Sequence, residues 1–244
     1  MKMSSNLRTL GLVSLLSLAS ACSPKAVIRE RIESPIQEQS EYNKFADISE
    51  YCFEISPQVS IAVKEEKTPP REFLKRNEGV EAAINGPYFG LDDRTEGVVF
   101  LANNHYFGSR KPEHTRGYFT INKNGQEVRV DDKLKGSFSD YWLVIGTHPM
   151  LVRNNKFYRE AEEKRYSKIT APRSAIGTKN GKNICFAVSN SNFSMEGWAN
   201  KLRVRGYKDA INLDGGPYSQ LATREGELGQ GNSPTRLVIF SYKK

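Results

Sequence analysis

The stretch NLDGGPYSQL, residues 212–221, contains one acidic residue, Asp214, directly after a run of apolar residues. That run, AINL at positions 210–213, predicts a short β-strand that ends at the carboxylate. Gly215 and Gly216 follow, and glycine lets a backbone approach a ligand closely because it has no Cβ atom. An Asp-Gly pair is also typical of a plain hairpin turn, so this stretch alone leaves both a turn and a functional site open.

Three other stretches share this character, an apolar strand beside polar or glycine residues. They are AINGPYF (residues 83–89), HPMLV (148–152) and PRSAIG (172–177). If the strands are neighbours, the side chains of Asn85, Arg173, Asn212 and Asp214 meet at one end of a sheet.

A carboxylate, a guanidinium and two amides are suited to a sugar phosphate. Arginine binds phosphate oxygens with a fork of donors, amides hold hydroxyl groups, and a carboxylate serves as acid, base or nucleophile. Each residue also has an ordinary structural explanation. Asn85 fits a turn, Arg173 a surface ion pair, and Asp214 a turn or a helix cap, and spacing alone does not choose between these explanations.

Strand-like segments outnumber helical ones, and Gly, Asn and Asp turns separate them. The segment 194–207 predicts a helix, with Ser194 as its N-cap and Gly206 as its stop, and TPPREFLKRN (68–77) predicts a shorter one. The longer helix lies between two strand-like segments. We expect an α+β fold, a single mixed domain over residues 50–244 around a large, mostly antiparallel β-sheet with a few helices.

Residues 1–21 have the three parts of a secretory signal: a basic start, a short apolar core and small residues before Cys22. LASAC (18–22) also resembles a bacterial lipobox, which implies lipidation of Cys22. We therefore expect an exported, membrane-anchored lipoprotein of the bacterial cell envelope, in the outer membrane if the cell is Gram-negative. Plain secretion and an uncleaved anchor are the alternatives. The polar residues 22–49 predict a flexible tether.

The formal net charge of the 244-residue chain is +8, and it falls to +6 when residues 1–21, with Lys2 and Arg8, are removed. The basic residues are spread along the chain, which favours a solvated basic surface over a nucleic-acid interface. We therefore expect no nucleic-acid partner.

Cys52 and Cys185 both lie in strand-like segments, where a disulfide and two buried free thiols are both consistent with the sequence. No Cys/His cluster predicts zinc, and no motif predicts a cofactor. A divalent cation such as calcium, held by the acidic loop near Asp92, stays open. Ser219 follows two glycines, but the three histidines are isolated in the sequence, which disfavours a Ser-His hydrolase.

The motifs INGPYF, PMLVRNNK, PRSAIG, GYKDAINLDGGPYSQL and RLVIF, in this order, resemble the phosphodiester glycosidase family over about residues 75–240. The resemblance implies a site lined by Asn85, Gly86, Arg173, Asn212, Asp214, Gly215, Gly216 and Ser219. The chain departs from the family pattern at Pro217-Tyr218 and at His148-Pro149. Both departures bear on which substrate the site accepts and less on the chemistry of the reaction. We expect His148 to contact the substrate.

The implied reaction is hydrolysis of the bond between the anomeric carbon of a sugar and a phosphodiester oxygen. In this hypothesis Arg173 binds the phosphate, where negative charge accumulates. Asp214 activates water or stabilises the oxocarbenium-like centre, and Asn85 and Asn212 orient the sugar. The expected partner is a sugar phosphodiester or a phosphorylated glycan.

Glycosidases usually use a second carboxylate. Glu96 ranks first, because it leads directly into a strand, ahead of Asp92, Asp93 and Glu196. Two alternatives have different chemistry: a non-catalytic envelope lipoprotein that binds phosphorylated glycans, and a phosphodiesterase that cuts the P–O bond.

Overall fold

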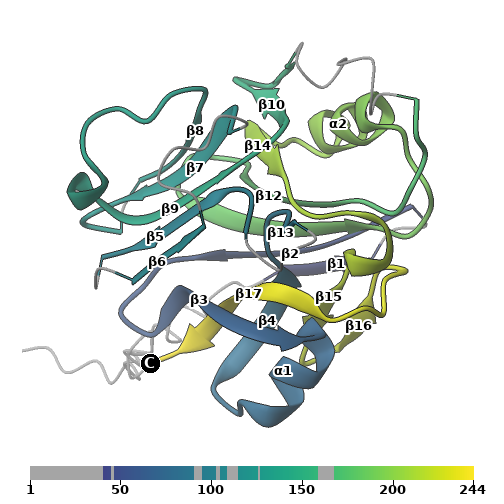
Figure 1. Ribbon diagram of the computed structural model, residues 1–244, viewed down its shortest axis with the longest axis horizontal. Coiled ribbons are helices and arrows are strands. Elements are labelled where there is room, and N and C mark those ends of the chain that lie inside the picture. Colours follow the sequence, from purple (N-terminus) through teal and green to yellow (C-terminus); the bar gives the residue numbers. More distant parts are fainter. Residues whose placement is uncertain are drawn as a thin grey trace, which may run out of the picture. The chain divides into compact units, whose positions relative to one another are not determined.

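The chain is built mainly of β-strands, which form three sheets with antiparallel pairing in the part that the structure describes (Figure 1). This computed structural model describes residues 41–44, 47–90, 95–102, 105–108, 115–125, 127–158 and 168–244. These residues belong to one compact unit, Glu38–Lys244. The predicted α+β class is confirmed, but the strands are divided among three sheets instead of lying in one large sheet.

The largest sheet has seven strands. In spatial order they are β1 (Glu41–Lys44), β2 (Ile48–Glu54), β13 (Asn183–Ser189), β12 (Ser174–Thr178), β14 (Asp209–Asn212), β10 (Met150–Arg153) and β11 (Lys156–Phe157). Strands β12 and β14 are buried along their whole length, although each begins and ends with a polar residue. Strands β13 and β14 both pair antiparallel with β12 and therefore run in the same direction, as the predicted strand–helix–strand unit requires.

The other two sheets have five strands each. The β4 sheet has the order β16 (Gly226–Leu228), β15 (Leu221–Thr223), β4 (Val80–Asn85), β17 (Thr235–Lys243) and β3 (Val59–Thr68). The β9 sheet has the order β6 (His105–Gly108), β5 (Val98–Leu101), β9 (Tyr141–Thr147), β7 (Gly117–Asn122) and β8 (Val128–Asp131). One apolar core joins all three sheets, because Phe186, Ile84 and Ile145 are fully buried in the same cluster.

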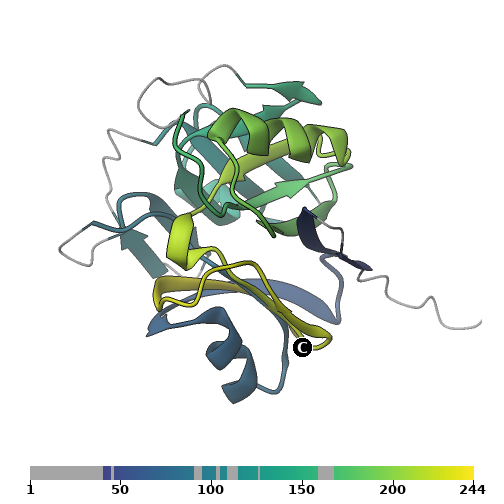
Figure 2. The same cartoon turned by 90° about the vertical axis from the view of Figure 1, so that its right-hand side faces the viewer.

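Each of the two helices in the described part of the chain covers one face of a sheet (Figure 2). Helix α1 (Pro70–Arg76) packs Phe73 and Leu74 against the β4 sheet. Helix α2 (Met195–Val204) packs Trp198 and Leu202 against the seven-stranded sheet. Neither helix is long and apolar enough to cross a membrane.

The ends of α2 follow from its sequence. Before its first turn, the Ser194 hydroxyl accepts a hydrogen bond from the Gly197 N–H at 3.0 Å, as an N-cap does. After its last turn, Gly206 adopts φ 83°, a left-handed conformation that ends helices and that glycine adopts without steric cost. Both caps confirm the prediction from the sequence.

Strand pairing begins inside the segment that the sequence predicts as a tether. Strand β1 pairs with β2 from Glu41 to Lys44, and β2 begins at Ile48. The polar composition of β1 gives no strand signal, because β1 lies at the edge of the sheet. The predicted signal segment and Cys22 lie outside the described residues.

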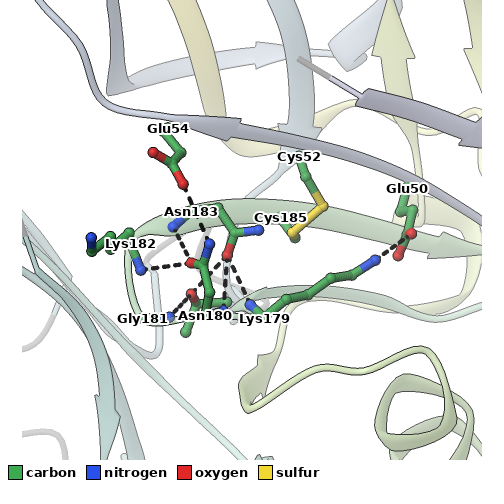
Figure 3. Close-up of a disulfide and its surroundings, with 10 residues drawn as sticks. Glu50, Cys52, Glu54, Lys179, Asn180, Gly181, Lys182, Asn183 and Cys185 are labelled. Carbon is green, nitrogen blue, oxygen red and sulfur yellow. Dashed lines mark hydrogen bonds and ion pairs between the residues drawn. A yellow bond between two sulfur atoms is a disulfide. The ribbon is translucent and has the colours of Figure 1, made fainter. Parts of the chain in front are cut away.

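Cys52 and Cys185 form a disulfide between β2 and β13 (Figure 3). The two residues are directly opposite each other in the antiparallel pair, and both are buried. Close to the disulfide, the Lys179 ammonium group forms an ion pair with Glu50, whose side chain is buried on β2. Of the two possibilities that the sequence left open, the structure contains the disulfide.

We expect the double substitution Cys52→Ala and Cys185→Ala to lower the free energy of unfolding by about 2–4 kcal/mol. The bond joins residues 133 positions apart, so its loss frees a long loop in the unfolded chain. Urea denaturation followed by circular dichroism measures the change. Wild-type protein kept in a reducing agent should match the variant, and equal midpoints for oxidised and reduced wild type would contradict the prediction.

Candidate active site

The stretch that begins at Asn212 is not a hairpin. It leaves the seven-stranded sheet at the end of β14, forms the single 3₁₀ turn η3 (Gly216–Tyr218) and enters the β4 sheet as β15. Asp214 therefore lies where the chain crosses from one sheet to another. The convergence predicted for one sheet end occurs at the junction of two sheets.

Main-chain hydrogen bonds hold this crossing to two other segments. The Leu213 N–H donates to the Ser174 carbonyl at 2.9 Å, and the Gly216 N–H donates to the Pro172 carbonyl at 2.9 Å. The Asp214 N–H donates to the Gly86 carbonyl at 3.1 Å. The crossing is thus fixed between the start of β12 and the end of β4, which brings three of the predicted motifs together.

Asn85 fixes the main chain of Asp214. Its side-chain N–H group donates to the Asp214 carbonyl at 2.8 Å and to the Gly86 carbonyl at 3.2 Å, while its side-chain oxygen accepts from the Gln220 N–H at 3.2 Å. The Ser174 hydroxyl also donates to the Asp214 carbonyl. Asn85 is fully buried and its described hydrogen bonds go to main chain, which favours a positioning role over contact with a sugar.

The carboxylate of Asp214 is buried, with 8% of the residue exposed. Burial raises the pKa of Asp214 to about 7. The Gly215 N–H, which donates to Oδ1 at 2.8 Å, opposes this rise, whereas the negative charge of Glu96 adds to the rise. A carboxyl group that titrates near neutral pH is suited to proton transfer.

Of the two candidates for a second carboxylate that the structure describes, Glu96 and Glu196, Glu96 is the one whose charge acts on Asp214. It is exposed, its N–H donates to the Tyr88 carbonyl at 2.8 Å, and Phe89 and Thr95 beside it form an antiparallel bridge. Glu196 lies instead in the first turn of α2 and lines a surface cavity with Lys156 and Arg203. Asp92 and Asp93 lie outside the described residues.

Arg173 is a buried cation that has no carboxylate partner within the described residues. Its Nε donates to the Phe193 carbonyl at 3.0 Å, and its Nη2 donates to the Ile169 carbonyl at 2.6 Å. Burial lowers the pKa of the guanidinium, and the nearby Tyr88 opposes this shift. The remaining nitrogen, Nη1, lies beside Gly215, where a Cβ atom would be 3.7 Å away. An uncompensated buried guanidinium is a typical binding group for phosphate or carboxylate.

Tyr88, His148 and Asn212 form a polar cluster at this junction. The Asn212 side chain donates to the Tyr88 hydroxyl, and the Tyr88 and His148 rings are stacked with centroids 5.0 Å apart. The Asn212 N–H donates to the Pro149 carbonyl at 3.1 Å, which brings the segment of His148 to the end of β14. The Asn212 side-chain oxygen is buried, and among the described residues it has no hydrogen-bond partner.

The residues after Asp214 form the turn by which the chain passes from the seven-stranded sheet to the β4 sheet. Gly216 adopts φ 61°, which starts the η3 turn, and Tyr218 packs edge-on against Phe89 with ring centroids 5.0 Å apart. Ser219 is fully buried, and its hydroxyl makes no hydrogen bond within the described part of the chain. The departure from the family pattern at Pro217-Tyr218 thus adds an aromatic side chain beside Phe89.

Gly86 is required by a close contact. A Cβ atom at this position would lie 2.6 Å from the Leu237 Cβ atom and 2.9 Å from the Leu237 carbonyl oxygen. We expect Gly86→Ala to lower the free energy of unfolding by about 1–3 kcal/mol, because β4 and β17 would have to separate. Thermal unfolding measures the effect. Gly79→Ala is the control, since its nearest neighbour would be 3.8 Å away, and equal losses in both variants would contradict the argument.

Three contacts of the site were not predicted from the sequence. Ser189 accepts a hydrogen bond from the Arg173 N–H at 2.7 Å, and the carbonyls of Ile169 and Phe193 hold the guanidinium. Main-chain carbonyls carry no residue signature, so no sequence pattern marks them. Tyr88 lies in the motif INGPYF, two residues after Gly86 at the end of a strand. This position could have marked Tyr88 as a site residue from the sequence.

A metal ion is not indicated by the described residues, which contain no group of three or more His, Cys, Asp or Glu side chains that could bind one. The acidic loop near Asp92 lies outside them, so calcium there stays an open possibility from the sequence.

Comparison with solved structures identifies the class of fold. The chain is similar to the catalytic domain of zebrafish N-acetylglucosamine-1-phosphodiester α-N-acetylglucosaminidase auto-inhibited by its pro-peptide, with a TM-score of 0.66 and 18% identity over 87% of this chain and 85% of that one. A hypothetical protein from Synechocystis matches with 14% identity and a TM-score of 0.49, over 84% of this chain and 61% of that one. A TM-score this low supports no conclusion. The chain thus shares the fold of the zebrafish domain.

The family model of phosphodiester glycosidase matches residues 78–238, and the chain belongs to this family. The resemblance noted in the motifs is confirmed. The chain is accordingly a hydrolase, and membership of the family implies a sugar phosphodiester as the class of substrate. A comparison with functionally curated proteins found no match.

Proposed function

We propose that this hydrolase cleaves the bond between a sugar's anomeric carbon and a phosphodiester oxygen in an envelope or extracellular glycan. The observation that carries the proposal is a pair of buried, oppositely charged groups that do not neutralise each other. Asp214 titrates near pH 7, and Arg173 is buried; within the described residues no ion pair joins them or engages either one. Main-chain contacts hold both beside the same crossing of the chain.

Arg173 and Asp214 have separate roles in the proposed reaction. The group that leaves is a phosphate monoester, which takes the electrons of the broken C–O bond. It is a good leaving group that needs little proton donation, and Arg173 stabilises the negative charge that accumulates on it. Ionised Asp214 accepts a proton from the attacking water or stabilises the positive charge at the anomeric carbon. Among the candidates that the structure describes, Glu96 is the best-placed second carboxylate. Tyr88, His148 and Asn212 form the polar wall for the sugar.

Hydrolysis in oxygen-18 water tests this assignment directly. A sugar-1-phosphodiester incubated with purified protein should yield sugar that contains the label, because water attacks carbon. Label in the phosphate would show instead that the P–O bond is cut. Binding without product over hours would overturn the enzymatic proposal and leave the glycan-binding alternative.

The activity is expected to depend on the ionisation of Asp214. Since the proposed role needs the carboxylate, and its pKa is about 7, kcat/KM should rise about tenfold per pH unit below that value and level off above it. Initial rates in overlapping buffers between about pH 5 and pH 9 measure the profile. A profile that falls as pH rises through 7 would assign Asp214 to the role of general acid.

We also propose that the chain is exported and anchored to the membrane through lipidated Cys22. The signal pattern of residues 1–21 supports export, and a disulfide persists in compartments outside the reducing cytosol. Mass spectrometry of the membrane fraction should find a lipid on Cys22, and Cys22→Ala should release the protein from that fraction. An unmodified chain in the soluble fraction would exclude the anchor.

A further inference from the structure

A second cavity lies at the other end of the strands that position Asp214. Its volume is about 670 Å³. In the central strands Thr178 is opposite Asp209, at the cavity end, and Ala175 is opposite Asn212, at the Asp214 end. With a rise of about 3.4 Å per residue, about 10 Å of strand separates Asp209 from Asn212. The cavity is therefore distinct from the candidate active site.

Hydrogen bonds between neighbouring turns build the walls of this cavity. The Val128 N–H donates to the Gly181 carbonyl at 2.9 Å, which fastens β8 to the turn between β12 and β13. The Lys208 N–H donates to the Thr178 carbonyl at 2.9 Å, which fastens the start of β14 to the same turn. The Asn154 N–H donates to the Asp209 carboxylate at 2.8 Å. A cavity fixed in this way needs little rearrangement to accept a ligand.

The cavity lining carries five basic and three acidic side chains. Arg129 is paired with Glu127, and Arg153 and Lys135 are paired with Asp131. Lys182 and Lys208 remain, and neither ammonium group forms an ion pair with any carboxylate in the part of the chain that the structure describes.

The two unpaired lysines lie close to the same turn. The Lys208 ammonium nitrogen would be 3.6 Å from a Cβ atom at Gly181, the residue next to Lys182. Figure 3 shows the Lys182 side chain pointing away from the disulfide and from Glu54. Two ammonium groups beside one turn can together bind a single anionic group.

Hydrogen-bonding groups for hydroxyls lie in the same cavity. The Asp209 carboxylate, already held by one N–H, and Asn154 line it. Asn180 also borders the cavity, but its side chain holds the turn, because Oδ1 accepts from the Lys182 and Asn183 N–H groups and Nδ2 donates to Glu54. Carboxylates accept hydrogen bonds from the hydroxyls of a sugar, and amides both accept and donate, whereas a plain anion would need cations alone. The set therefore matches a ligand that carries both an anionic group and several hydroxyls.

We propose that this cavity is a secondary binding site for an anionic saccharide, with its phosphate or carboxylate on Lys182 and Lys208 and its hydroxyls on Asp209 and Asn154. The site is independent of the chemistry at Asp214, so it stands or falls separately from the proposed hydrolysis. A glycan with repeated anionic groups would be held at two places on one domain, which raises its effective affinity without a new catalytic contact.

Backbone-amide NMR with defined probes tests the proposal. Glucose 1-phosphate should shift the amide signals of Gly181, Lys182 and Asp209, whereas uncharged glucose should not. Inorganic phosphate should bind there at least about tenfold more weakly, since it gains nothing from Asp209. Glucuronate carries a carboxylate in place of the phosphate and therefore distinguishes the two anionic groups. Shifts with glucuronate support a carboxylated ligand. Shifts with glucose 1-phosphate alone support a phosphorylated ligand.

The variant Lys182→Ala with Lys208→Ala should weaken glucose 1-phosphate binding at this cavity about tenfold while leaving the melting temperature unchanged. The matched control, Lys75→Ala with Lys243→Ala, removes the same charge from α1 and β17 and should leave these shifts intact. Absent shifts for both charged sugars, equal binding of inorganic phosphate, or the same loss in both variants would overturn the proposal.

Discussion

Replacing Asp214 with asparagine is expected to lower kcat/KM on a sugar-1-phosphodiester by about 10²–10⁴-fold. Asparagine is neutral, so it neither accepts a proton from water nor stabilises positive charge at the anomeric carbon. The fold should persist, because the contacts that hold residue 214 through its N–H and carbonyl are main-chain contacts. The asparagine oxygen can also keep the bond from the Gly215 N–H. Initial rates with the purified protein measure the loss.

Stability distinguishes loss of chemistry from loss of fold. The pKa of Asp214 is about 7 in the folded protein, against 3.8 as its ordinary value. The carboxyl therefore stabilises the fold when protonated, and this contribution is lost as pH rises through 7. Asp214→Asn stays neutral, so its melting temperature should exceed that of wild type at about pH 8, and the difference should shrink towards about pH 5.

Glu81→Gln is the matched control for the loss of one carboxylate. Glu81 lies on β4, the strand that leads to Asn85, but its side chain is paired with Lys243. Its kcat/KM should equal that of wild type. If Asp214→Asn retained more than about a tenth of wild-type activity, Asp214 would not be the catalytic carboxylate.

Replacing Arg173 with lysine is expected to lower kcat/KM by about 10²-fold, mainly through kcat. Lysine keeps the charge, but it has one nitrogen, whereas the guanidinium anchors through Nε and Nη2 and still presents Nη1 beside Gly215. A lysine cannot both be held by the carbonyls of Phe193 and Ile169 and reach the phosphate. Steady-state kinetics separate the effect on kcat from that on KM.

Inhibition by inorganic phosphate shows whether Arg173 binds the substrate or only supports the fold. If it binds phosphate, Arg173→Lys should raise the inhibition constant while the melting temperature changes little. Arg203→Lys is the control, because Arg203 is exposed on α2 and its side chain hydrogen-bonds to Asn200 alone among the described residues. An unchanged inhibition constant in Arg173→Lys would remove Arg173 from the phosphate site.

The helices were predictable because their signals are local. Ser194 and Gly206 mark the ends of α2, and Pro70 marks the first turn of α1. The division of the strands among three sheets was not predictable, since pairing depends on residues far apart in the chain. Strand β1 escaped prediction because its polar edge sequence does not alternate.

The site was partly predictable, because its motifs are also local signals in the sequence. The motifs named Asn85, Arg173 and Asp214, but residue type does not reveal which groups a side chain contacts. The Asn85 amide is directed at main chain, and the two carbonyls that hold Arg173 belong to residues with no distinctive side chain. Roles that depend on packing at the junction of two sheets need the fold itself.

The position of Asp214 on a crossing between two sheets has a consequence for folding kinetics. Ser174 belongs to one sheet, and Asn85 and Gln220 are tied to the other, so neither sheet alone can hold the carboxylate in place. Contacts between residues 40 or more than 100 positions apart form late, because a large loop must close first. Recovery of activity after denaturation should therefore trail recovery of strand structure and report the final docking of the sheets.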